Sequence, residues 1–231
     1  MACNLAHEAR LRARGLRFIA GIDEAGRGPL AGPVVACAVI LPEKIRVKGL
    51  NDSKQLTELR REAIFEKLMA REDLSWAVAI LESEEVDRIN ILRATHEAMR
   101  RAVAALPEVP EHVLIDGLPV HPFPIPQTAI VGGDGLSYSI AAASVIAKVT
   151  RDRLMVQRDK LYPQYGFAQH KGYGTPQHLA ALKEHGPCPI HRRTFLPAEQ
   201  PEFEFEARGS TPSAGEAGRE TGGEVSARES V

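Results

Sequence analysis

Four acidic side chains stand where carboxylates can hold a divalent cation, each after a short apolar or glycine-containing run. They are Asp23, Glu24, Asp116 and Asp134. Clustered carboxylates repel one another unless cations neutralise them, and ligation by oxygen alone favours Mg²⁺ or Mn²⁺ over zinc. Two such ions about 4 Å apart can activate a water and stabilise the leaving oxygen in phosphodiester hydrolysis. The residue types therefore predict a metal-dependent hydrolytic centre.

Each acid taken alone also has a simpler explanation. A single aspartate after a strand is more often a turn residue or a helix cap, which applies to Asp116 and Asp134. The pair Asp23 and Glu24 is harder to explain in this way, because adjacent like charges after an apolar strand are costly without a partner. Since a continuing strand would point the two side chains to opposite faces, we expect a loop to begin there. Asp152 is the reserve candidate if Asp134 serves only as a turn residue.

A glycine-bracketed arginine directly after the first acidic pair is the candidate surface for a substrate. Its residues are Gly26, Arg27 and Gly28, and glycine lets a backbone approach a ligand closely. The chain has no P-loop pattern of the GxxxxGKS or GxxxxGKT type. In the polar loop 51–54, Lys54 is a candidate phosphate contact, with a solvated loop lysine as the alternative.

Basic, aromatic and glycine residues alternate over residues 165–175. A flat ring beside cations suits a sugar–phosphate backbone, so Tyr173 is a candidate substrate contact. The alternative is a packed loop with Phe167 in the core and Tyr173 half-buried. Structural zinc is not expected nearby, because the spacings of the histidines and the cysteine match none of the usual patterns. Those residues are His170, His178, His185, His191 and Cys188.

The elements that must position these residues follow from hydrophobic periodicity. Strands are predicted at 17–23, 34–41, 74–81, 112–116 and 127–132. Helices are predicted at 4–15, 57–72 with Thr57 as N-cap, 84–106, 138–160 and 176–185. Three strands with one helix inserted, then strands alternating with helices, favour an α/β fold with a mixed sheet. The acids can then meet at one edge of the sheet, where active sites of such folds form. The charged residues within 148–153 are Lys148, Arg151, Asp152 and Arg153, and we expect them to form a solvated helix face with Asp152 paired to neighbouring arginines.

The composition divides the chain into a domain at 1–197 and a tail at 198–231. The tail holds eight acids and three bases, a net charge of −5, and few large apolar residues, so we expect it to be disordered. It is either an interaction segment or a solubilising one. The body holds 22 acids and 26 bases, a net charge of +4, which is compatible with a polyanionic partner.

The cysteines and the apolar runs indicate the compartment. Cys3, Cys37 and Cys188 are scattered and odd in number, which fits a reducing environment. Charges occupy the N-terminus where a signal peptide would need an apolar run, and the longest apolar stretch, 33–42, is too short to span a bilayer. We expect a soluble, cytoplasmic, monomeric protein.

An ordered set of motifs resembles type 2 ribonuclease H (ribonuclease HII) of bacteria. The motifs are GIDEAGRGP at 21–29, LNDSK at 50–54, LIDG at 114–117, GD at 133–134, SIAAASVIAKVTRD at 139–152 and YGFAQHKGYGT at 165–175. One block alone is moderate evidence, whereas the ordered set is specific. The resemblance covers about residues 17–196 and leaves the tail outside.

The resemblance implies an RNase H-like mixed β-sheet flanked by helices, with a C-terminal helical extension. It also implies an endonuclease that requires Mn²⁺ or Mg²⁺. Its substrates would be the RNA strand of RNA–DNA hybrids and ribonucleotides embedded in duplex DNA, with 5′-phosphate and 3′-hydroxyl products. The implied catalytic and metal-binding residues are Asp23, Glu24, Asp116 and Asp134. The implied substrate contacts are Gly26, Arg27 and Gly28 at the 2′-hydroxyl, Tyr173 at the sugar, and Lys54 at a phosphate.

Two other classes of function remain open at this point. A metal-dependent DNA nuclease or strand-transferase is possible on the same fold, because a cluster of acids does not by itself choose the sugar. A non-catalytic nucleic-acid-binding module is disfavoured, since carboxylates near a phosphate backbone weaken binding unless metals are present.

Overall fold

The computed structural model describes residues 3–50 and 56–196 of the chain. The candidate Lys54 and the predicted tail lie outside the described residues, so both remain predictions. Among the helices of the described part, none is long and apolar enough to cross a membrane.

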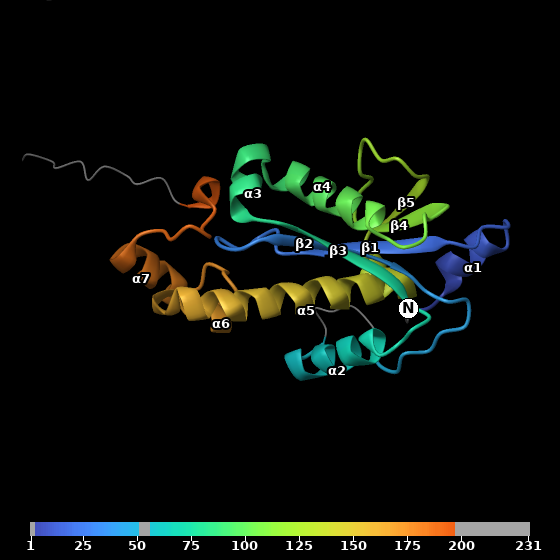
Figure 1. Cartoon of the computed structure of the whole chain (residues 1–231), viewed down its shortest axis with the longest axis horizontal. Coiled ribbons are helices and arrows are strands. Elements are labelled where there is room, and N and C mark those ends of the chain that lie inside the picture. The colour runs from blue at the N-terminus through green and yellow to red at the C-terminus, as the bar shows by residue number, and fades with distance from the viewer. Residues whose placement is uncertain (1–2, 51–55, 197–231) are drawn as a thin grey trace, which may run out of the picture. The chain divides into compact units, whose positions relative to one another are not determined.

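A mixed five-stranded sheet forms the centre of the fold (Figure 1). Its strands are β1 (Ile19–Ala25), β2 (Val34–Ile40), β3 (Ser75–Leu81), β4 (His112–Asp116) and β5 (Gln127–Ile130), in the spatial order β3-β2-β1-β4-β5. The pairs β1–β2 and β2–β3 are antiparallel, whereas β1–β4 and β4–β5 are parallel. The predicted strands and the predicted mixed sheet are therefore confirmed.

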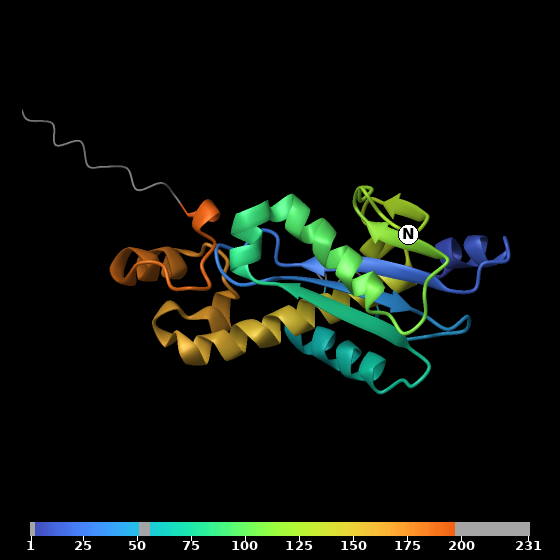
Figure 2. The same cartoon turned by 45° about the horizontal axis from the view of Figure 1, so that its top comes forward.

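Helices lie on both faces of this sheet, and the most C-terminal of them lies beyond its end (Figures 1 and 2). They are α1 (Ala6–Arg12), α2 (Glu58–Met69), α3 (Ser83–Ile89), α4 (Ile91–Ala104), α5 (Tyr138–Leu161), α6 (Phe167–His170) and α7 (Pro176–His185). One core cluster joins α3 and α4 to the sheet, and a second joins α2 and α5 to the other face. The alanine-rich start of α5 is fully buried, so this helix lies close against β1 and β2.

The predicted helix 84–106 is in fact two helices, α3 and α4, and that prediction was wrong. Asn90 separates them with a left-handed backbone, φ 67°, and its side chain accepts a hydrogen bond from the backbone N–H of Arg93 at 3.1 Å. With ψ 162° this conformation is strained for a residue that has a side chain, but asparagine caps helices well, so one residue ends the first helix and starts the second. Leu92, in the first turn of α4, is 53% exposed.

The first helix is attached to the start of α5 through a buried carboxylate. Glu8 Oε1 accepts hydrogen bonds from Ser137 Oγ at 2.6 Å, from Ser139 Oγ at 2.7 Å and from the Ser139 backbone N–H at 2.9 Å. A negative charge at a helix N-terminus is favourable, because free N–H groups and the helix dipole converge there. Glu8 therefore fixes the first turn of α5 against the rest of the domain.

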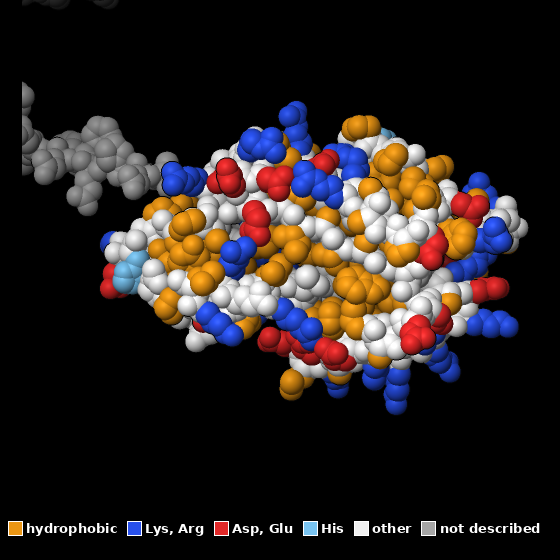
Figure 3. All heavy atoms as spheres, viewed as in Figure 1, with side chains coloured by type: hydrophobic (Ala, Val, Ile, Leu, Met, Phe, Trp, Pro, Cys, Tyr) orange, Lys and Arg blue, Asp and Glu red, His pale blue; other side chains and the backbone are white. Residues whose placement is uncertain are grey.

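The C-terminal helical part packs at the far end of α5. Phe167 is fully buried in a small core with Tyr165, whereas Tyr173 is 44% exposed. Phe167 thus has the packed position that one interpretation of the loop gave it. On the face shown in Figure 3, apolar side chains gather over the edge strand β3, and acidic and basic side chains are mixed around them. This face offers no continuous basic surface for a phosphate backbone.

Candidate active site

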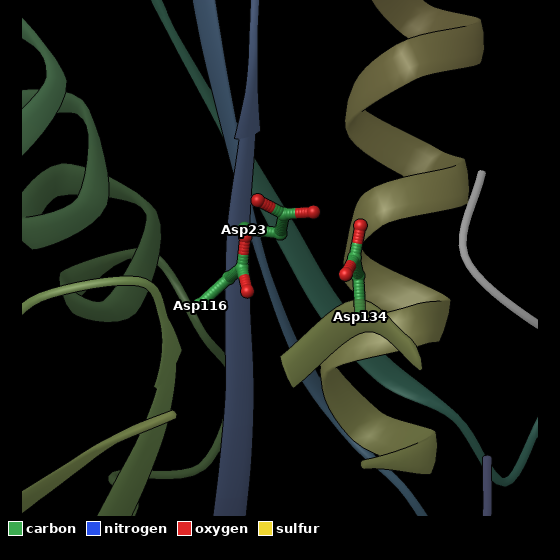
Figure 4. Close-up of side chains that lie close together, drawn as sticks. All are labelled: Asp23, Asp116 and Asp134. Atoms are coloured by element: carbon green, nitrogen blue, oxygen red, sulfur yellow. The ribbon is translucent and has the colours of Figure 1, made fainter. Parts of the chain in front are cut away.

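Three of the four predicted acids come together beside the sheet (Figure 4). One carboxylate oxygen each from Asp23, Asp116 and Asp134 lies within 4.8 Å of the others, and within the described part of the chain this is the single group of such ligands. Asp23 belongs to β1 and Asp116 ends β4, its parallel neighbour. Since parallel strands point their carboxyl ends the same way, these two acids share one end of the sheet.

Asp134 reaches the other two acids through the short 3₁₀ turn η2 (Gly133–Gly135), which precedes α5. The backbone N–H of Gly133 donates to Asp116 Oδ1 at 2.7 Å and so ties this turn to the end of β4. A Cβ on Gly133 would lie 2.6 Å from Ile140 Cδ1 and 3.2 Å from Ile130 Cβ, so glycine lets the turn fold onto α5 without displacing the Ile140 side chain. Asp134 is therefore a turn residue and a member of the acidic cluster at once.

The environment of Asp23 shows that the cluster suits a cation. The side chain is 3% exposed, and burial, followed by the charges of Glu24 and Asp116, raises its pKa well above the usual range. Hydrogen bonds from Ser144 and from the Glu24 backbone N–H oppose this rise. A divalent cation held by oxygen ligands would offset the same repulsion. The donor set, three carboxylates in close range, fits Mg²⁺ or Mn²⁺.

Glu24 has a different position from the three aspartates. The expected loop at Asp23 is absent: β1 continues to Ala25, which pairs with Val35 of β2, so that expectation was wrong. Glu24 is not part of the 4.8 Å group. It lines the same cavity as Asp23, and its carboxylate lies 3.4 Å from the guanidinium of Arg27.

The cavity beside the acids has a volume of about 260 Å³. Its lining combines Asp23, Glu24, Ala25, Gly26, Arg27, Gly28, Asp116, Ser144, Lys148 and Tyr173. The structure thus brings the predicted glycine–arginine strip and the predicted tyrosine to two of the clustered acids, while the buried Asp134 lies outside this lining. A larger cavity, about 570 Å³, lies at the opposite end of β1, remote from the acidic cluster.

The Tyr173 ring forms one wall of this cavity. A Cβ added to Gly28 would lie 3.8 Å from Tyr173 Cε1, so the ring stands directly beside the strip. Lys148 Nζ lies 5.9 Å from the ring centroid. A half-exposed ring next to an accessible backbone is a surface on which a sugar can pack.

Sequence reasoning missed the part of α5 that faces the site. The solvated face expected at 148–153 was wrong for Arg151, which is fully buried, and for Asp152, which is 7% exposed. Asp152 accepts a hydrogen bond from Lys148 Nζ at 2.7 Å and lies 3.5 Å from Arg61, so the reserve candidate is an ion-pair partner outside the acidic cluster. The spacing of four between Ser144, Lys148 and Asp152, which places them on one helix face, was the available signal.

A chain of neutral histidines supports the backbone of Tyr173. His178 Nδ1 lies 2.9 Å from the Tyr173 carbonyl oxygen, which can only accept, so this nitrogen donates. His178 Nε2 must then accept from His191 Nε2 at 3.0 Å, and His191 Nδ1 accepts from the Cys188 backbone N–H at 2.9 Å. Burial lowers the pKa of both rings, that of His191 to about 4.

The two neutral histidines predict a loss of protein stability in acid. Between about pH 6.5 and pH 4 the unfolded chain protonates His191 while the folded protein does not, so the free energy of unfolding falls as the pH falls through this window. The contribution is about 3 kcal/mol, at 1.36 kcal/mol per pKa unit. Urea unfolding of wild type and His191→Gln at several pH values measures it, and the variant should show the smaller fall. Equal falls in the two proteins would contradict the assignment.

The sheet, its flanking helices and the carboxylate cluster together define a metal-dependent nuclease with an RNase H-like fold. The family model for ribonuclease HII matches residues 20–198, and the chain belongs to this family. It is similar to ribonuclease HII of Geobacter sp. (strain M21), with 59% identity over 83% of each chain. It is also similar to that of Desulfitobacterium hafniense (strain DSM 10664 / DCB-2), with 55% identity over 85% of this chain and 75% of the relative.

Solved structures agree with this assignment. The crystal structure of ribonuclease H2 from Pyrococcus horikoshii OT3 matches with a TM-score of 0.61 and 31% identity, over 76% of this chain and 92% of that one. The predicted RNase H-like fold and the predicted family are therefore confirmed. The chain is a ribonuclease H, a metal-dependent endonuclease that acts on RNA–DNA hybrids.

Proposed function

We propose that the enzyme hydrolyses the RNA strand of hybrids and also cuts at single ribonucleotides embedded in duplex DNA. The observation that carries this proposal is the shared cavity: the Gly26–Gly28 strip and the Tyr173 ring line the same space as Asp23 and Asp116. The 2′-hydroxyl is the group that distinguishes RNA from DNA at a given position. A surface that recognises one ribose directly beside the acids requires only a single ribonucleotide in the substrate and no long run of RNA.

In this proposal Asp23, Asp116 and Asp134 hold Mn²⁺ or Mg²⁺, and Glu24 acts from the adjoining wall of the cavity. The cation, when bound, neutralises the cluster and lowers the cost of generating the attacking hydroxide and the leaving oxygen. The chain's own residues position the substrate. The backbone of the strip hydrogen-bonds the 2′-hydroxyl, and Tyr173 packs against the sugar.

The same arrangement supports products with 5′-phosphate and 3′-hydroxyl ends. A 2′-hydroxyl held by the backbone of Gly26–Gly28 is kept from attacking its own phosphate, so water is left as the nucleophile. Attack by water with departure of the 3′-oxygen leaves the phosphate on the 5′ side of the next nucleotide. We further propose that the enzyme works as a monomer in the cytoplasm, and that Lys54 contacts a phosphate.

A comparison of three substrates tests the proposal. We expect the wild-type enzyme, with Mn²⁺ or Mg²⁺, to cut a hybrid and a DNA duplex with one ribonucleotide, and to leave an all-DNA duplex intact. Ligation and mass analysis of the fragments identify the ends. Equal cleavage of the all-DNA duplex would favour a DNA nuclease, and binding that persists in EDTA with no cleavage in metal would favour a non-catalytic module.

Replacement of Tyr173 isolates the contribution of its ring. Stacking of a base on an aromatic ring contributes about 1–3 kcal/mol, and we expect packing of the sugar on Tyr173 to fall in the same range, so Tyr173→Ala should lower kcat/KM on the single-ribonucleotide duplex by about 10- to 100-fold. Tyr173→Phe, which keeps the ring, is the matched control and should retain most of the activity. The proposed role of the ring fails if the alanine and phenylalanine variants cut equally well.

A further inference from the structure

Arg151, in the middle of α5, is a fully buried cation whose partners are backbone carbonyls. Its Nε donates to the Pro33 carbonyl at 2.9 Å, its Nη2 to that of Ala31 at 3.1 Å, and its Nη1 to that of Lys171 at 3.0 Å. The first two carbonyls follow the glycine–arginine strip, and the third precedes Tyr173 in the other loop. One planar guanidinium therefore joins the two segments that form the walls of the cavity.

The glycines of both segments allow this close approach. Gly26 has φ 100°, and a Cβ there would collide with the Arg151 side chain and lie 2.6 Å from the Pro33 carbonyl oxygen. Gly172 has φ 86°, and a Cβ there would collide with the Ala31 carbonyl oxygen. Side chains rarely adopt such backbone conformations, so glycine is needed at both positions for conformation and for space. The two loops are built around the guanidinium.

Arg151 also lies under the substrate surface. Its guanidinium carbon is 6.0 Å from the centroid of the Tyr173 ring, the ring that stands beside Gly28. A buried cation is costly to desolvate, and here hydrogen bonds to three backbone carbonyls offset that cost. The planar guanidinium presents its N–H donors in fixed directions, so it can hold three carbonyls from two loops in one arrangement.

A second buried arginine offers a contrast. Arg192 is also fully buried, and its guanidinium donates to the carbonyls of Gly26 at 2.6 Å, Pro29 at 3.0 Å and Gly32 at 2.9 Å. All of these lie within one loop. Arg192 therefore shapes the strip itself, whereas Arg151 sets the strip against the loop of Tyr173.

We propose that Arg151 is a positioning residue for ribose recognition, which holds the glycine–arginine strip and the Tyr173 ring at the separation that fits one ribonucleotide. This inference rests on the proposed function, in which the strip and the ring contact the sugar and recognise it. Arg151 touches no substrate, and its effect is transmitted through Tyr173 and the strip.

A double-mutant cycle tests this role, with kcat and KM measured separately on the single-ribonucleotide duplex. Lysine offers one ammonium in place of the fork, so Arg151→Lys should lower kcat/KM about 10-fold or more. In the Tyr173→Ala background the same substitution should cost less than about threefold, because the ring is no longer there to be positioned. Arg192→Lys, the matched control, should cost the same factor in both backgrounds.

Thermal unfolding and circular dichroism show whether each variant is folded. If Arg151→Lys is unfolded, Arg151→Gln, which keeps two N–H donors, takes its place in the cycle. Failure of both variants to fold would assign Arg151 to fold stability and overturn the inference, as would equal losses from Arg151→Lys with and without the Tyr173 ring. If wild type itself does not cut the single-ribonucleotide duplex, the proposed function fails instead, whatever the variants do.

Discussion

Asp23→Asn is expected to lose cleavage by about 10³-fold or more and yet to unfold at a higher temperature than wild type when both are in EDTA. The loss of activity follows from the position of Asp23, one of three carboxylates within 4.8 Å of one another. A neutral amide is a poor ligand for Mg²⁺ or Mn²⁺, and the charge stabilisation that a metal supplies to a transition state amounts to several kcal/mol. At about 1.4 kcal/mol per tenfold, that is at least three orders of magnitude in rate.

The gain in stability follows from the electrostatics of the metal-free protein. Burial and the charges of Glu24 and Asp116 raise the pKa of Asp23, so the folded state holds a proton that the unfolded state releases. This contribution to the free energy of unfolding is largest in acid, and it falls as the pH rises from about 3.9 through the folded-state pKa. At neutral pH wild type therefore carries a penalty that an uncharged amide avoids.

Thermal unfolding in EDTA and in a series of metal concentrations measures both effects. Wild type should gain stability with metal as mass action requires, while Asp23→Asn should gain little. Asp152→Asn is the matched control, because Asp152 is a buried carboxylate that is paired with Lys148 and Arg61. It should lose stability in EDTA but keep the response to metal. Wild-type cleavage by Asp23→Asn, or a lower unfolding temperature in EDTA, would contradict the assignment of Asp23.

Local patterns were sufficient to predict most elements of the fold. The apolar runs ending in Asp23 and Asp116 became neighbouring strands, and the helix predicted at 176–185 has those bounds. The runs are informative because a strand buried on both faces is apolar along its length. The convergence of the acids then follows from the parallel pairing of β1 with β4.

Long-range contacts explain what local patterns missed. The extension of β1 to Ala25 depends on its pairing with Val35, and nothing near Glu24 in the sequence reveals that partner. The local sequence predicts a surface position for Arg151 on a helix. It is buried because the loop that contains Ala31, 120 residues earlier in the sequence, packs against it. Asn90 interrupts a regular apolar pattern, and its left-handed backbone is selected by the packing of α3 and α4 against the sheet.

Gly21→Ala is expected to be strongly destabilising, at about 3 kcal/mol or more. Gly21 lies in β1, two residues before Asp23, and a Cβ there would collide with the carbonyl carbon of Ser139 and the backbone nitrogen of Ile140. Backbone atoms cannot rotate away as a side chain can, and inserting even one methyl group into a packed core costs about 1–3 kcal/mol, occasionally more. The first turn of α5 must therefore move, against the hydrogen bonds that Glu8 makes to it.

The same displacement should weaken metal binding, because Asp134 lies in the turn that leads into α5, whereas Asp23 stays on β1. Gly135→Ala is the matched control: a Cβ at Gly135 has open space around it, and its backbone is not left-handed. Urea unfolding should show a large fall in stability for Gly21→Ala and a change within about 0.5 kcal/mol for Gly135→Ala. Both substitutions add one methyl group within two residues of a clustered aspartate, so they are directly comparable. If the two variants had equal stabilities and equal responses to metal, the close packing of β1 on α5 would not set the spacing of Asp23 and Asp134.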